Sequence, residues 1–83
     1  MHNKMRIQID TNLSKPLFNQ LMDQIKKAVM DGLLKPGDPL PSIRQLANDL
    51  ELNHNTVAKA YRLLERDSVI QTKGYRGTSI HGD

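Results

Sequence analysis

The sequence contains no cysteine and no tryptophan, and its aromatic residues are one phenylalanine and two tyrosines. The absence of cysteine excludes disulfide bonds and thiolate metal sites, and it permits a reducing compartment. No apolar run reaches the roughly 18 residues of a membrane span, and no charged and then apolar leader opens the chain. We therefore expect neither a membrane span nor a secretory signal peptide, and we expect a cytoplasmic protein.

Groups that could perform catalysis or hold a metal are also scarce. The histidines, His2, His54 and His81, are scattered along the chain, and no HExxH, P-loop or paired-carboxylate motif is present. An enzyme needs a nucleophile, a base and a stabilising group that converge in one pocket, and a metal site needs convergent ligands. We therefore expect no enzymatic activity, no metal site and no cofactor.

The length and charge of the chain limit its fold and its partners. The 83 residues have room for one domain, which we place at residues 1–83. A chain of this size buries only about 60% of the surface that it exposes when unfolded, so its core must be small. Lys and Arg number 12 against 9 Asp and Glu, which gives a net charge of +3. This excess favours a polyanionic partner, although an ordinary basic surface would have the same charge.

The N-terminal third of the sequence predicts a strand and a helix. Residues 5–10, MRIQID, alternate apolar and polar side chains, which predicts a short edge strand with one buried face. Apolar residues then recur at helical spacing and predict a first helix over about residues 15–32. Ser14 can cap this helix, Pro16 fits its first turn, and Gly32 permits it to stop.

The middle of the sequence predicts two short helices joined by a tight turn. Prolines crowd into LKPGDPLPS and preclude a continuous helix there. Ser42 and Gln45 form a capping box that opens a second helix ending near residue 50. Asn53 is the next good cap, and it opens a third helix over about residues 53–67. The second and third helices are thus separated by only a few residues, and a connection this short is typical of a helix-turn-helix.

The C-terminal segment predicts a β-hairpin. VIQTKGYRGTSIH, over about residues 69–81, reads as two short strands around a tip that contains glycine. The expected fold is therefore mainly α with a small β-hairpin. Its three helices and a two- to three-stranded wing sheet make it a winged helix-turn-helix.

The predicted third helix has a polar side that suits DNA. At about 100° per residue, Val57, Ala60, Tyr61 and Leu64 fall on one side, and the opposite side presents Asn55, Lys59, Arg62 and Arg66. Amides can read base edges and cations can neutralise phosphates, as an element in the major groove must do. A solvated helix face is the alternative interpretation.

Cations elsewhere add to this face. Arg44 lies on the outer side of the second helix, where it could reach a guanine edge or a phosphate, or form a surface ion pair. Lys73 and Arg76 lie near Gly74 on the projecting hairpin and could reach a phosphate or the minor groove. Hairpins also need glycine for backbone reasons alone, so the combination of helix-turn-helix and hairpin is the more specific signal.

The chain resembles the winged helix-turn-helix domain of the GntR family of bacterial transcription regulators over residues 7–81. The stretches that resemble it are KPLFNQLMDQIKKAVMDGLLKPGDPLPSIRQLANDL, NHNTVAKAYRLLE and KGYRGTSI. The last helix, together with the IQID segment, is most similar to the YtrA branch, whose members usually carry a helical dimerisation segment beyond the wing. The resemblance implies sequence-specific binding of double-stranded DNA in the nucleoid, by a repressor. It also implies a homodimer of the full-length protein on a palindromic operator.

The resemblance assigns DNA contacts to the turn, the third helix and the wing. The base-reading positions are Arg44 and His54. Contacts with phosphates or bases fall on Asn53, Asn55 and Thr56. Lys73 and Gly74 enter the minor groove, and Arg76 and Thr78 contact the DNA backbone. With the cationic side of the third helix included, the predicted DNA-binding residues are Arg44, Asn53, His54, Asn55, Thr56, Lys59, Arg62, Lys73, Gly74, Arg76 and Thr78.

Three positions depart from the family pattern. Glu51 and Ser68 stand where glycine is usual, in the turn and after the third helix, which raises the question of backbone strain at both. His54 stands where other branches use arginine, so a bidentate guanine contact is in doubt and an exposed first-turn residue is the alternative. Asn53 is expected to act as a helix cap more than as a base reader.

A second function remains open at this stage. The winged helix also serves as a protein–protein interaction module, because a fold does not fix a function. The family normally continues into an effector-binding or dimerising domain, whereas this sequence stops three residues after Ile80. An excised DNA-binding domain and a natural short form both fit that ending.

Overall fold

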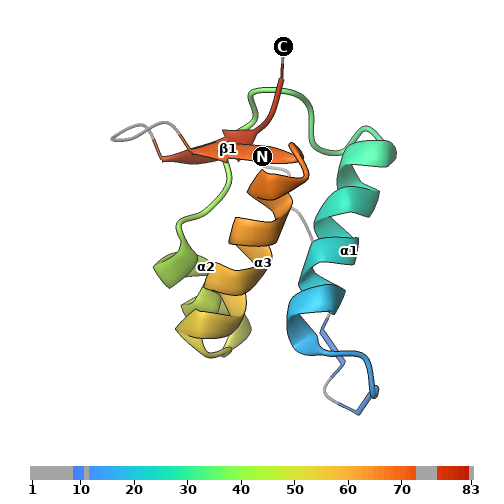
Figure 1. Cartoon of the computed structure of the whole chain (residues 1–83), viewed down its shortest axis with the longest axis vertical. Helices are drawn as coiled ribbons and strands as arrows, with labels where there is room; N and C mark the ends of the chain where they lie inside the picture. Colours follow the sequence, from blue (N-terminus) through green and yellow to red (C-terminus); the bar gives the residue numbers. More distant parts are fainter. Residues whose placement is uncertain (1–8, 11, 73–76, 83) are drawn as a thin grey trace.

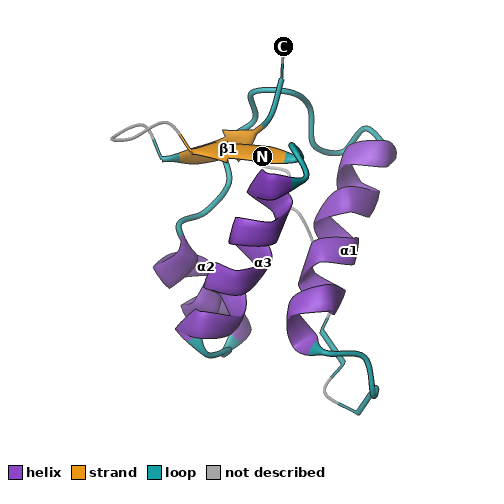
Figure 2. Cartoon of the chain, in the orientation of Figure 1, coloured by secondary structure: helices purple, strands orange, loops and turns teal. Residues whose placement is uncertain are grey.

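The computed structural model describes residues 9, 10, 12–72 and 77–82. Its elements are α1 (Leu17–Met30), α2 (Ile43–Leu50), α3 (His54–Arg66), β1 (Ile70–Thr72) and β2 (Thr78–Ile80). Figure 1 shows α3 between the other two helices, with the antiparallel β1–β2 sheet across its C-terminal end. The arrangement is the winged helix-turn-helix that the sequence predicts, mainly α with a small sheet (Figure 2).

The core lies where α3 meets α1, α2 and the sheet. Its largest fully buried side chains are Leu21, Ile25, Val57, Leu64, Ile70 and Ile80. In α3 the buried positions are 57, 60, 61 and 64, a spacing of three to four residues that places them on one side of the helix. Because that side is used for packing, the opposite side of α3 faces outward.

The first helix begins differently from the prediction. Pro16 is its N-cap, and no side chain caps it, so the expected cap by Ser14 is wrong. Proline suits this place because its fixed φ is compatible with the start of a helix. At the other end, Gly32 has a φ of +80°, and the N–H of Leu33 donates to the carbonyl of Ala28 at 2.9 Å. This left-handed closure is the stop that glycine permits.

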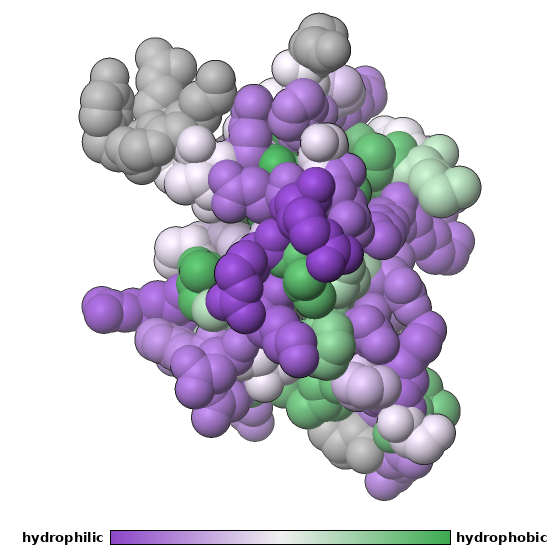
Figure 3. All heavy atoms as spheres, in the orientation of Figure 1, coloured by the Kyte–Doolittle hydropathy of each residue, from purple (hydrophilic) through white to green (hydrophobic). Residues whose placement is uncertain are grey.

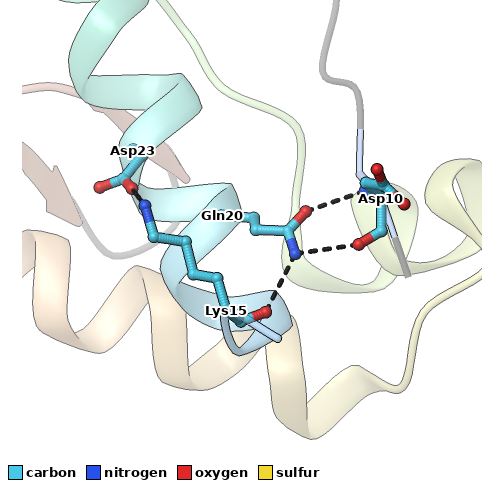
Figure 4. A network of polar contacts seen from close by, with 4 residues as sticks. All are labelled: Asp10, Lys15, Gln20 and Asp23. Atoms are coloured by element: carbon cyan, nitrogen blue, oxygen red, sulfur yellow. Dashed lines mark hydrogen bonds and ion pairs between the residues drawn. The ribbon is translucent and has the colours of Figure 1, made fainter. Parts of the chain in front are cut away.

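A buried glutamine fixes the segment before α1. The side-chain oxygen of Gln20 accepts a hydrogen bond from the N–H of Asp10 at 2.8 Å. Its amide nitrogen donates to the carbonyls of Asp10 and Lys15, both at 3.0 Å (Figure 4). Lys15 also forms an ion pair with Asp23 of α1. One carboxamide therefore satisfies both backbone polar groups of Asp10, as a neighbouring strand would.

The strand predicted over residues 5–10 falls largely outside the described residues. Ile9 and Asp10 are described, and neither lies in a strand, so the prediction is wrong at these two positions. Ile9 nevertheless packs against the core. The alternating pattern therefore indicated that the side chain of Ile9 faces inward. The backbone of Asp10 is held by its hydrogen bonds to the side chain of Gln20.

The proline-rich linker adds a short antiparallel segment to the sheet. Pro39 pairs with Ser79 of β2 in an isolated bridge. On one side of this pair the N–H of Leu40 donates to the carbonyl of Thr78 at 2.9 Å. On the other side a backbone hydrogen bond of the same length joins the linker to β2. Pro39 thus occupies a position where antiparallel partners exchange no hydrogen bonds with each other. Its missing N–H costs the ladder nothing.

Tyr61 ties α3 to the end of this linker. Its hydroxyl donates to the carbonyl of Pro41 at 2.7 Å, and its side chain is buried with 4% of its surface exposed. Burial raises the pKa of Tyr61 well above its usual range, because the phenolate would lose its hydration. The folded protein therefore retains the hydroxyl proton at pH values where an unfolded chain releases it.

We expect Tyr61→Phe to lower the free energy of unfolding by about 1 kcal/mol near neutral pH, since it removes a buried hydrogen bond. The contribution of the buried Tyr61 hydroxyl to stability is complete below the unfolded-state pKa of about 10. Above that pH the unfolded chain releases the hydroxyl proton, and this contribution is lost as pH rises. The phenylalanine variant lacks this loss, so its deficit should shrink in alkali. Urea denaturation of both proteins near neutrality and at roughly pH 10.5 measures the difference. A deficit independent of pH would contradict a buried, protonated hydroxyl.

Candidate nucleic-acid interface

The turn between α2 and α3 fixes the start of the outward-facing helix. The side-chain oxygen of Asn53 accepts a hydrogen bond from the N–H of Asn55 at 2.7 Å, so Asn53 is the N-cap of α3. The capping role expected for Asn53 is confirmed. The bond engages only the oxygen of the carboxamide, and the side-chain nitrogen has no partner among the described residues. That N–H₂ group therefore remains free to donate to a phosphate or a base edge.

Two residues without a glycine's freedom close α2 and α3. Glu51 and Ser68 have positive φ values of 57° and 63°. After each, a backbone N–H reaches back across the helix end, from Leu52 to Ala47 and from Val69 to Leu64, both at 2.9 Å. A left-handed conformation costs a residue with a side chain about 1–2 kcal/mol. The strain suspected from the missing glycines is therefore present, and the closing hydrogen bonds offset it.

Arg44 lies in the first turn of α2, next to a capped helix end, and faces solvent. The hydroxyl oxygen of Ser42 accepts from the N–H of Gln45 at 3.0 Å, which caps the helix. Arg44 is exposed, and it has no ion-pair partner in the part of the chain that the structure describes. The surface ion pair considered for Arg44 is thus not found there, and its guanidinium is available to a ligand.

The polar side of α3 is held outward. Its exposed residues include His54, Asn55, Lys59 and Arg62, whereas Thr56 is half-buried. Figure 3 shows strongly hydrophilic side chains gathered over α3 on one face of the molecule. Amides and cations on this face are therefore accessible to a partner.

Ion pairs reduce the number of cations on and near α3 that are available to a ligand. Arg66 lies 3.2 Å from a carboxylate oxygen of Asp67, and Lys26 lies 3.5 Å from the other oxygen. Within the described ranges, carboxylates also pair with Lys15 and Lys27 but not with Arg44, Lys59 or Arg62. Cations that are already paired contribute less to binding a polyanion, so the positive charge available to a ligand lies mainly on Arg44, Lys59 and Arg62.

Lys59 makes a contact that sequence reasoning did not predict. Its ammonium nitrogen lies 4.1 Å from the centre of the Phe18 ring on α1. Phe18 packs against the core cluster while remaining partly exposed. Helical spacing within each segment could not reveal the pair, because it depends on how α1 and α3 pack together.

The base of the predicted wing is described, and its tip is not. Ile70 pairs with Ile80 and Thr72 pairs with Thr78 in the β1–β2 ladder. Thr78 is half-buried at the start of β2. The other predicted wing contacts, Lys73, Gly74 and Arg76, lie outside the described residues. The described strands place the start and end of the wing next to the C-terminal end of α3.

Two further searches concern the described residues only. No described helix is both long and apolar enough to cross a membrane. No described group of three or more His, Cys, Asp or Glu side chains is placed to hold a metal ion.

The sequence of this chain is similar to those of bacterial regulatory proteins. The model of the family "Bacterial regulatory proteins, gntR family" matches residues 17–80. The HTH-type transcriptional repressor YtrA of Bacillus subtilis is 49% identical over 74 residues, which are 89% of this chain and 57% of that protein. The chain spans 55–61% of the lengths of three such curated relatives.

Solved structures agree with the fold. YtrA from Sulfolobus acidocaldarius, described as a GntR-family transcription factor, superposes with a TM-score of 0.87 at 40% identity, covering 93% of this chain and 81% of that one. The DNA-binding domain of AraR, solved in complex with operator ORX1, has a TM-score of 0.77 at 20% identity and covers 95% and 99%. At that identity the likeness to AraR is one of fold.

Proposed function

Because this chain belongs to the gntR family of bacterial regulatory proteins, we propose that it binds double-stranded DNA at specific sequences and regulates transcription, as a repressor. Similarity to two proteins named YtrA confirms the predicted branch. The curated relatives are transcription regulators rather than enzymes. The one observation that carries the proposal is the outward, capped face of α3, where Lys59 and Arg62 are exposed and have no carboxylate partner among the described residues.

In the proposed complex α3 lies in the major groove, which is wide enough to admit a helix. The side chains that would read base edges are Arg44, His54 and Asn55. Those that would contact phosphates are Asn53, Thr56, Lys59 and Arg62. The wing would lie on the adjacent minor groove through Lys73, Gly74, Arg76 and Thr78. The exposure of Arg44, His54, Asn55, Lys59 and Arg62 supports this assignment. The side-chain nitrogen of Asn53, which has no partner among the described residues, supports it too.

We further propose that residues 1–83 form one DNA-binding domain of a protein that acts as a homodimer on a palindromic operator in the nucleoid. Dimers of this fold place two recognition helices about one helical turn of DNA apart, so the symmetry of the operator follows the symmetry of the protein. Two linked domains bind with an avidity that one domain lacks. The solved complex of the AraR domain with its operator supports DNA as the ligand of this fold.

Titration of a labelled duplex at several salt concentrations tests the proposal against a protein-binding role. We expect log affinity to fall linearly with log salt, with a slope of about −0.9 for each phosphate that is neutralised. Three neutralised phosphates would give a slope of about −2.7. Negligible binding to any duplex at low salt, together with capture of a protein partner, would favour the interaction module instead.

A further inference from the structure

A cation–π contact joins α1 to the proposed DNA face. Phe18 lies in the first turn of α1, partly exposed at the edge of the core. The ammonium nitrogen of Lys59 lies 4.1 Å from the centre of its ring, well inside the roughly 6 Å range of the interaction. The two side chains come from helices that pack side by side (Figure 1). The contact therefore depends on the tertiary structure and not on neighbours in sequence.

The ring restrains Lys59 without cancelling its charge. A lysine side chain is long and flexible, and it loses much rotamer freedom when its ammonium group is fixed on a phosphate. A carboxylate partner would hold the group but would also neutralise it. Among the described residues Lys59 has no such partner. An aromatic face holds the cation through its quadrupole and leaves the full positive charge for the ligand.

We propose that Phe18 is a positioning residue of the DNA interface, whose ring places the Lys59 ammonium group for contact with a phosphate before DNA arrives. This rests on the proposed function, and it extends the interface to α1, where no DNA-contacting residue was predicted. Leucine at position 18 would retain apolar packing against the core but would have no aromatic face. Tyrosine would retain both.

Affinity for a labelled duplex tests the role through four variants: Phe18→Leu, Phe18→Tyr, Lys59→Met and the Phe18→Leu/Lys59→Met double variant. Phe18→Leu should weaken binding by about two- to fivefold, the size of an exposed cation–π contact, while Phe18→Tyr binds like the wild type. In the Lys59→Met background, Phe18→Leu should have no further effect. Lys59→Met should also reduce the salt slope by about 0.9, which Phe18→Leu should leave unchanged because the charge remains.

An equal loss on Phe18→Leu with and without Lys59 would overturn the role, since it would reflect packing alone. A second measurement needs no DNA. In the free protein the side-chain protons next to the Lys59 ammonium should show an upfield ring-current shift, in a signal that Lys59→Met removes. This shift should be lost in Phe18→Leu.

Different results would contradict the role of Phe18 and the proposed binding of DNA. An absent ring-current shift would overturn the placement of Lys59 even if the wild type bound DNA. A wild type that showed the shift but bound no duplex would overturn the proposed function, and with it the role of Phe18 in binding.

Discussion

Replacement of Arg44 by alanine is expected to relax the choice of base at one operator position, at a cost of about 1–3 kcal/mol for the preferred sequence. Arg44 is exposed on the first turn of α2, and no carboxylate in the described part of the chain competes for its guanidinium. An arginine can make two parallel hydrogen bonds to a guanine edge, and alanine can make none. Selection from random duplexes by the chain fused to a dimeriser measures the change in the preferred sequence.

Two variants separate base reading by Arg44 from simple attraction. Arg44→Lys keeps the charge but lacks the planar fork, so it should lose discrimination while keeping the salt slope. Lys59→Ala should weaken all sequences about equally, because a phosphate contact carries no sequence information. An unchanged base preference in Arg44→Ala would show that Arg44 reads no base.

Replacement of Leu64 by alanine is expected to lower the free energy of unfolding by about 2–5 kcal/mol. Leu64 is 0% exposed and lies in the core cluster, on the buried side of α3. A small domain has only a few kcal/mol of stability to lose, so much of the variant should be unfolded at 37 °C. Thermal and urea denaturation measure the loss, and duplex binding should fall with the folded fraction.

Arg62 provides the matched control on the same helix. It is exposed, so Arg62→Ala should change the free energy of unfolding by only about 0.5 kcal/mol or less. It should nevertheless weaken duplex binding. If Leu64→Ala unfolded no more readily than Arg62→Ala, the division of α3 into a packed side and a binding side would be wrong.

Features encoded within one segment could be predicted from the sequence. The apolar side of α3 follows from the spacing of Val57, Tyr61 and Leu64, because a helix that packs on one side must repeat at about 3.6 residues. The caps at Ser42 and Asn53 follow from side chains that bond only two or three residues away. The alternation around Ile9 predicted a strand with one buried face; Ile9 does pack against the core, but residues 9 and 10 are not in a strand.

Features that depend on distant residues could not be predicted. The carboxamide of Gln20 holds Asp10 from ten residues away, and no periodic pattern records such a bond. The contact between Phe18 and Lys59 requires the relative position of two helices, which only packing determines. Positive φ at Glu51 had a sequence signal, since glycine is usual there in the family, but the geometry settled the question. The predicted contacts of the wing tip remain predictions.

Pro39 has a consequence for the behaviour of the protein at high local concentration. Its segment borders β2 on the side away from β1, so among the described residues it forms an outer margin of the wing sheet. At a pair without mutual hydrogen bonds, a backbone N–H would point away from β2 toward the outside, and proline has none to offer. A further chain is thereby denied a donor with which to lengthen the sheet at this margin. Proline at this position is therefore expected to disfavour edge-to-edge association with another copy of the chain.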